Sequence, residues 1–174
     1  RFRAEAMTLP ELSQVLWAAQ GVTSARHGLR TVPSAGATYP LEAFVLVGKH
    51  TVDELEAGVY RYDPQANSLG LHREGDLRME LATAALDQSF AARAPACIVI
   101  CAVYQRTCFR YDRRGERYVH MEAGHAAQNI HLAAVALKLG TVVIGAFDDD
   151  EVQKTLGLES QLKPLCLMPL GKPV

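Results

Sequence analysis

The chain has 174 residues, of which 49% are hydrophobic and 21% charged, and its formal net charge is −1. This length allows one domain with a substantial core, so we expect a single domain over 1–174. The near-neutral charge, without a basic stripe, argues against nucleic acid as a partner. No apolar run reaches the roughly 20 residues that cross a bilayer. We therefore expect no membrane partner and a cytoplasmic location.

Apolar periodicity and turn residues divide the chain into alternating helices and strands. Thr8 as a cap and Pro10 in the first turn predict a first helix that ends at Gly21. A Gly-, Ser-, Thr- and Pro-rich stretch over 21–40 predicts a long loop, which in a compact domain is usually functional. In chain order, the remaining expected elements are a strand over 41–47, a hairpin over 58–71, a helix over 76–88, a strand over 96–104, a helix over 116–139, a strand over 141–144, a helix over 148–156 and a strand over 162–170.

This order of elements predicts an α+β fold with a central mixed or antiparallel sheet flanked by helices, not a doubly wound Rossmann fold. Asp76 and Asp148 are expected to cap helices, and Gly140 to end the long one. Two prolines in the last strand indicate a sheet edge or a bend. No Gly-x-Gly-x-x-Gly turn and no Gly-Lys-Ser/Thr motif is present, so a bound phosphate must be held in another way.

The four cysteines, at positions 97, 101, 108 and 166, contain no Cys-x-x-Cys pair and no His at zinc-site spacing. Cys97 and Cys101 lie four apart in a predicted strand, so their side chains share a face. We expect all four to be reduced and no metal to be bound.

Three segments carry residues suited to ligand chemistry. The first is a turn of small residues bounded by prolines, which lets backbone N–H groups and a hydroxyl approach a flat ligand. A ligand-free surface loop would have the same composition, so this segment alone is a weak signal. It consists of Pro33, Ser34, Ala35, Gly36 and Ala37, followed by Thr38, Tyr39 and Pro40.

The second segment places Glu122, His125 and Asn129 on one face of the predicted long helix. A metal site is one use of such side chains, but no third ligand is evident, so a buried cluster of satisfied hydrogen bonds is the expectation. Gly124 is costly inside a helix and indicates that something packs close to it. The stretch 104–117 links two core elements and is expected to form a variable lid.

The third segment ends a strand in the small-residue turn Gly145-Ala146, which leads through Phe147 into a helix. Backbone N–H groups at such a turn have no helical partner and can donate to an acceptor on a ligand ring. Asp148 is expected to cap the helix and not to act as an acid.

Together the three segments resemble the nitroreductase-like FMN-dependent flavoproteins, and most of all the azoline-dehydrogenase-type (SagB-like) branch. The motifs lie in the family's order, and the start and end of the chain fit as well. The matching runs are Pro33 to Glu42, Glu122 to Asn129, Gly145 to Asp149, Leu16 to Gly21 and Pro169 to Pro173.

The resemblance implies a homodimer with FMN at the subunit interface. The turn from Pro33 to Ala37 would meet the flavin of the partner subunit, and Gly145-Ala146 would lie over the ring with the Ala146 N–H aimed at its reactive nitrogen. Gly171 and Lys172 would lie near the phosphate. Arg1 would be the last residue of the family's Arg-x-Ser-x-Arg phosphate grip, whose Arg-x-Ser segment would precede Arg1 and is absent from this sequence.

The resemblance also implies an activity. The first expectation is a ping-pong oxidoreductase in which NAD(P)H reduces FMN, and a small-molecule acceptor such as a nitro compound or quinone then takes the electrons. A dehydrogenase of a peptide azoline or an amino-acid-derived substrate is the second, although no Lys-Tyr acid/base pair can be assigned. A non-catalytic flavin-binding partner subunit is the third.

Overall fold

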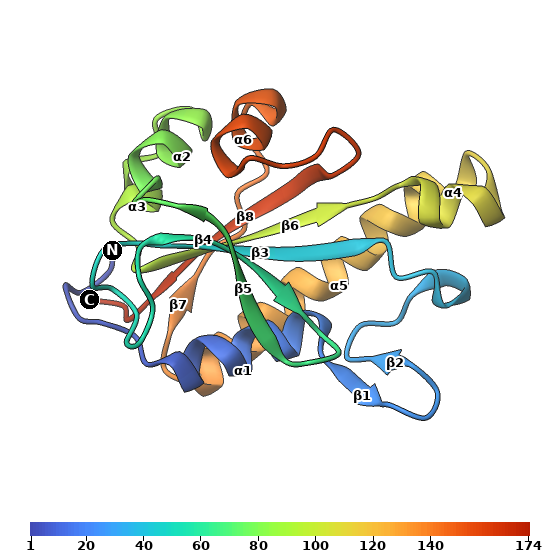
Figure 1. Ribbon diagram of the computed structural model, residues 1–174, viewed down its shortest axis with the longest axis horizontal. Helices are drawn as coiled ribbons and strands as arrows, with labels where there is room; N and C mark the ends of the chain where they lie inside the picture. The colour runs from blue at the N-terminus through green and yellow to red at the C-terminus, as the bar shows by residue number, and fades with distance from the viewer.

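Every strand pair of the main sheet is antiparallel, in the order β5-β4-β3-β6-β8-β7 (Figure 1). The structure, a computed structural model, describes residues 1–174. The strands are β3 (Leu41–Val47), β4 (Gly58–Asp63), β5 (Ser68–Glu74), β6 (Ala96–Ala102), β7 (Gly140–Thr141) and β8 (Lys163–Gly171). The helices are α1 (Leu9–Gln20), α2 (Arg78–Ala84), α3 (Ser89–Ala92), α4 (Gln105–Tyr111), α5 (Arg114–Ala136) and α6 (Asp149–Leu156). The expected α+β class is confirmed, and the sheet is antiparallel throughout.

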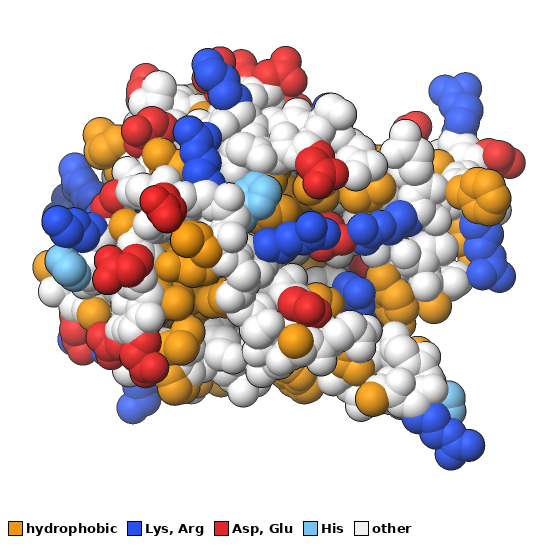
Figure 2. Space-filling model, viewed as in Figure 1, with side chains coloured by type: hydrophobic (Ala, Val, Ile, Leu, Met, Phe, Trp, Pro, Cys, Tyr) orange, Lys and Arg blue, Asp and Glu red, His pale blue; other side chains and the backbone are white.

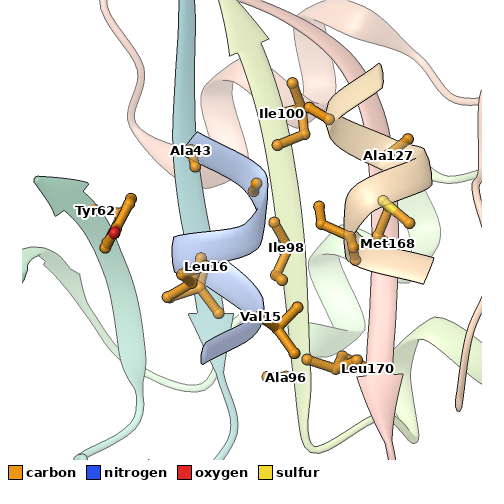
Figure 3. Packing of buried hydrophobic residues seen from close by; sticks show 14 of the residues in the cluster. Val15, Leu16, Ala43, Tyr62, Ala96, Ile98, Ile100, Ala127, Met168 and Leu170 are labelled. Carbon is orange, nitrogen blue, oxygen red and sulfur yellow. The ribbon is translucent and has the colours of Figure 1, made fainter. Parts of the chain in front are cut away.

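The sheet separates two apolar cores because side chains alternate between the faces of a strand. One face packs against α1 and α5, and the other against α2, α3 and α6 (Figure 1). Figure 3 shows the first core, in which Val15 and Leu16 of α1 lie over the sheet beside Ile98. The strands β3 and β6 contribute buried residues to both cores, which explains their continuous apolar sequence.

Four short elements, in two segments of the chain, were not expected from the sequence. The predicted loop over 21–40 contains a small hairpin of β1 (Val22–Ser24) and β2 (Leu29–Arg30), and a single 3₁₀ turn, η1 (Ala35–Ala37). The predicted lid over 104–117 contains the helix α4, which packs against η1 and α5. Four of these seven helical residues are exposed, Phe109 among them, so the segment carries little of the apolar periodicity that reveals a helix.

Two helix-end predictions were wrong and one was confirmed. The N-cap position of α2 is Leu77, one residue after Asp76. The Asp76 carboxylate accepts from the Arg78 N–H at 3.4 Å, from Lys49 N and from the Arg78 guanidinium. The long helix ends before Gly140, because Lys138 takes the left-handed turn (φ 58°) and Gly140 enters β7. Asp148 caps α6 as predicted, its Oδ1 accepting from the Glu151 N–H at 2.9 Å.

Three further features bear on the expectations. The helix expected over 76–88 is shorter than predicted: α2 ends at Ala84, because Leu86 and Asp87 take positive φ angles, and the separate helix α3 begins only at Ser89. β8 has only the two-residue β7 and a bridge from Ile144 on its outer side, in keeping with its prolines. None of the helices combines the length and apolarity of a membrane span.

The cysteine thiols are all free, and Cys97 and Cys101 share the core face toward α2 and α6 as predicted. Burial raises the pKa of Cys97 to about 12 and that of Cys166 to about 11. Thiols of this kind stay protonated at neutral pH and are poor nucleophiles.

Candidate functional site

The helix α5 divides the candidate site residues into two groups. His120, Ala123, Gly124 and Ala127 face a cavity on one side of it. Glu122 lies about 150° around the helix from the centre of that group, by the 100° that separates successive residues, and faces the opposite side. Between the cavity-facing group and Glu122, the surface of α5 is buried against the sheet on one side and exposed on the other.

The cavity holds about 710 Å³, which is in the range of small-molecule and cofactor sites. Half of its lining is hydrophobic, and its walls come from α5, the turn after β7, the start of α6 and the start of β8. The remaining lining residues are Tyr104, Val143, Gly145, Phe147, Asp149, Asp150, Lys163, Pro164, Leu165 and Cys166.

Two glycines leave this cavity open. A Cβ built on Gly124 or on Gly145 meets no atom within 4 Å, and neither residue has a positive φ. The expectation that something packs close to Gly124 was wrong within this chain, because the missing side chain opens onto the cavity. The open space and the apolar lining fit a flat aromatic ring.

The turn Gly145-Ala146 presents free donors beside this space. Ile144 exchanges two backbone hydrogen bonds with Leu167, at 2.8 and 3.0 Å, which fixes the start of the turn. The Ala146 carbonyl accepts from Gln88 Nε2 at 2.9 Å. The N–H groups of Gly145 and Ala146 have no acceptor within the chain, and both residues are exposed. The turn is therefore held from behind with its donors unpaired.

A tyrosine and a histidine of the cavity wall were missed by the sequence reasoning. The Tyr104 hydroxyl lies 2.5 Å from His120 Nε2, and the two rings meet edge to face with centroids 5.6 Å apart. Burial raises the pKa of Tyr104, and the carboxylates of Glu116 and Asp149 add to this effect. No spacing rule could reveal the pair, because the whole of α4 separates its members in sequence.

The turn from Pro33 to Ala37 lies outside the cavity, across α5. Gly36, Ala37 and Tyr39 all have positive φ angles, of 60°, 52° and 44°. The Ser34 hydroxyl accepts from the Tyr39 N–H at 2.9 Å, and Arg110 of α4 donates to the Gly36 carbonyl at 3.2 Å. The N–H groups of Ser34, Ala35 and Gly36 have no acceptor in the chain. This strained, clamped backbone with free donors is typical of ligand-binding segments.

Behind this turn lies a buried carboxyl group. The Glu122 side chain is 2% exposed, and its Oε1 has no hydrogen-bond partner. Burial raises the pKa of Glu122 to about 7, against the opposing effects of the Ser34 hydroxyl and the Arg30 guanidinium. Arg30 is anchored by the Gln20 side chain at 2.8 Å and stacks on the Tyr39 ring. Glu122 is therefore coupled to the turn through its neighbours.

The expected cluster of Glu122, His125 and Asn129 does not form. His125 is exposed, Glu122 is left with an unpartnered oxygen, and Asn129 Nδ2 instead donates to the backbone carbonyls of Ala18 and Thr31 at 3.2 and 3.4 Å. Helical spacing predicts that the three side chains share one side of α5, but in the structure Glu122 is buried, Asn129 is partly buried and His125 is exposed. No group of three or more His, Cys, Asp or Glu side chains is arranged to hold a metal ion.

Another carboxylate anchors the helix α4 over the turn. Glu42 at the start of β3 pairs with Arg106 at 2.6 Å and with Arg61 at 3.1 Å. Arg106 also donates to the Tyr39 carbonyl at 3.0 Å. Figure 2 shows basic and acidic side chains meeting across the middle of this face.

The three residues expected near a phosphate gather where the chain ends meet. The backbones of Arg3 and Lys172 are hydrogen-bonded at 2.9 Å, and the Arg1 carbonyl accepts from the last residue of the chain at 3.2 Å. The Lys172 ammonium pairs with Glu5 at 2.6 Å, while Gly171 is buried where a Cβ would collide with Pro95. None of the three lines the Gly145 cavity.

Comparison with known proteins gives a consistent result. The profile of the Nitroreductase family matches residues 1–172. The Methanocaldococcus jannaschii protein MJ1384, which carries a nitroreductase name, is 50% identical over 168 residues, covering 97% of this chain and 82% of that protein. The microcin B17-processing protein McbC of Escherichia coli is 29% identical over 148 residues. That alignment covers 82% of this chain and 54% of McbC.

A solved structure agrees with the sequence relatives. A chain of the E. coli microcin synthetase McbBCD complex, with truncated pro-MccB17 bound, superposes with a TM-score of 0.88 at 25% identity. The match covers 99% of this chain and 67% of that one.

Proposed function

The chain belongs to the nitroreductase family of FMN-dependent oxidoreductases, and from this membership we propose that it is an NAD(P)H-driven reductase of nitro compounds, quinones or similar acceptors. The cavity beside Gly145 carries this proposal. It combines an open apolar slot, free backbone donors and a polar wall in one place. Bound FMN supplies the transfer of electrons, as a hydride or singly, between donor and acceptor.

The proposed roles of the residues follow from their positions. Gly124 and Gly145 leave room for the flavin ring, and the Ala146 N–H offers a fixed donor to it. Arg1 and Lys172 would contribute positive charge toward the phosphate, with Lys172 exchanging its Glu5 partner for it. Gly171 lets the chain ends come together at that point.

We propose that the turn from Pro33 to Ala37 completes the site of a second subunit. None of its residues lines the cavity of its own chain. The exposed face of α5 carries large apolar side chains at helical spacing, Met121, Leu132 and Val135, which are 54%, 62% and 74% exposed. An apolar stripe of this kind is typical of a helix that packs against another copy. The homodimer is thus part of the proposal.

One relative favours a second candidate function. McbC is named for processing microcin B17, and the chain spans about half of it, 54%. On that likeness the same site would oxidise a peptide azoline or an amino-acid-derived ring, with oxygen as the acceptor. A flavin-binding subunit without turnover of its own is the third alternative, since a structural neighbour is part of a McbBCD complex.

The test begins with the visible spectrum of the purified protein after addition of FMN, followed by anaerobic titration with NADH and with NADPH. We expect a flavin band that is bleached by one of the two nicotinamides and restored by a quinone. A flavin band that neither nicotinamide bleaches, with turnover of an azoline peptide under oxygen, would support the second candidate. A protein that remains colourless would contradict all three.

A further inference from the structure

We propose that Tyr104 is the catalytic acid of the Gly145 cavity and that His120 positions it and supplies it with protons. This inference rests on the proposed reductase function and adds to it the source of the proton that the acceptor needs. It concerns two side chains of the cavity wall for which the motifs in the sequence gave no role.

The geometry of the pair suits proton transfer. Both side chains line the cavity, and Tyr104 Oη and His120 Nε2 are in direct hydrogen-bond contact, which is the contact that proton transfer needs. The tyrosine follows β6 and the histidine lies on α5, so two core elements fix the distance. Tyr104 is half-buried, whereas His120 is exposed and can exchange protons with water.

The surroundings keep the phenol in its donating form. The carboxylates of Glu116 on α5 and Asp149 on α6, together with Cys108 on α4, all disfavour a phenolate at Tyr104. Asp150 and Lys163 are the other charged groups of the cavity wall. A neutral phenol at neutral pH can give a proton to an acceptor, and an imidazolium beside it can return one.

The role proposed for Tyr104 follows from the number of protons that a two-electron reduction consumes. A quinone that receives a hydride on one oxygen still needs one proton on the other to become a hydroquinone. The Tyr104 O–H bond breaks as the new O–H bond of the hydroquinone forms. The His120 Nε2–H bond then breaks as the Tyr104 hydroxyl is restored, and the imidazole takes a proton from water. The two electrons come from NAD(P)H through the reductase activity proposed above.

Tyr104→Phe tests the acid directly, because it removes one hydroxyl from the cavity wall. Steady-state rates should be measured with a quinone and with ferricyanide, which takes one electron and no proton. We expect quinone turnover to fall on the order of 10²-fold, while ferricyanide turnover stays within about twofold of the unaltered protein. Equal losses with both acceptors, or no loss with either, would overturn the proposal.

His120→Ala tests the proton supply. We expect a smaller loss of quinone turnover, which added imidazole restores because the position is exposed. His120→Phe offers a ring without the nitrogen, so it should lose turnover as His120→Ala does. A loss that added imidazole does not reverse would assign His120 a merely structural role.

A matched control separates this proposal from the reductase function itself. Tyr118→Phe removes a hydroxyl from α5, two residues before His120 and outside the cavity, and should leave both acceptor rates unchanged. If the unaltered protein shows no nicotinamide-driven ferricyanide reduction, the reductase function is wrong. If it reduces ferricyanide and Tyr104→Phe reduces quinones equally well, only the proton role is wrong.

Discussion

The backbone segments on the two sides of α5 differ in their φ angles and in the free space around them. On the cavity side, Gly124 and Gly145 have ordinary φ angles and nothing within 4 Å of their missing side chains. On the other side, Gly36 and Ala37 have positive φ angles and are clamped by Arg110. The cavity side provides open space for a ligand, and the other side provides a rigid turn with unpaired backbone N–H groups. In the dimer proposed above, the turn of one copy would complete the cavity of the other, so that each site would have both features.

Subunit mixing gives the largest expected effect. Gly124→Leu would fill the cavity, and Gly36→Val would break the turn, where a Cβ lies 2.6 Å from Tyr111 Oη. Each variant alone should lose on the order of 10²-fold in turnover. When the two are co-expressed, half of the dimers are mixed and each contains one intact site, so about a quarter of the activity should return. A mixture no more active than its components would place the turn and the cavity in the same subunit's site.

The buried carboxyl behind the turn predicts a pH effect on stability. The pKa of Glu122 in the folded chain, about 7, lies above the 4.5 of an ordinary Glu. Its contribution to the free energy of unfolding is therefore fully present below about pH 4.5 and is lost as the pH rises through about 7.

Glu122→Gln measures this contribution. The variant should be more stable than the unaltered chain at pH 8, by up to about 3 kcal/mol, and the difference should disappear toward pH 4. Urea denaturation at pH 4, 6 and 8 gives the values. The same substitution at Glu80, on exposed α2, serves as the control and should change little. A gap between Glu122→Gln and the unaltered chain that does not vary with pH would contradict this account.

Gly124→Ala should move stability and cofactor binding in opposite directions. Alanine is favoured over glycine inside a helix, so the free energy of unfolding should rise by about 1 kcal/mol. The added methyl group enters the cavity, so the Kd for FMN should rise about tenfold. Gly70→Ala, also open and of ordinary φ but on β5, should leave the Kd unchanged. Unchanged FMN binding in Gly124→Ala would show that the ring lies elsewhere.

The smallest effect is expected at Lys172. Its ammonium is already paired with Glu5, so a phosphate gains only the difference between two partners. Lys172→Gln should weaken FMN binding about threefold at low salt and less at high salt, because exposed charges are screened. Titration of flavin fluorescence at two salt concentrations measures this. A loss that salt does not reduce would indicate a role other than charge.

Much of the fold could be predicted because its strands and long helices have strong apolar patterns. The continuous apolar runs at β3 and β6 and the periodic α1 were recognised in this way. The helix α4 was missed because it is short and mostly exposed and is held by ion pairs and hydrogen bonds to distant residues. Arg106, for example, reaches Glu42 of β3, which local sequence cannot reveal.

In the candidate site too, features of local composition could be predicted and features of tertiary packing could not. The turns at Pro33–Ala37 and Gly145-Ala146 have distinctive small-residue composition, so their sequence predicts segments suited to a ligand. The Tyr104–His120 contact depends on how β6 and α5 are packed, and the isolation of Glu122 depends on burial. Contacts and burial arise from the tertiary structure, so spacing along the chain could not separate Glu122 from His125.

The two chain ends run side by side as a short antiparallel pair, Phe2 bridging to Pro173 (Figure 1). Termini so close could be joined by a short linker, and a circularly permuted chain opened at the exposed turn after β4 would keep all the sheet pairings. Any segment joined to residue 1 or to residue 174 would start beside Arg1 and Lys172, next to the proposed phosphate contact.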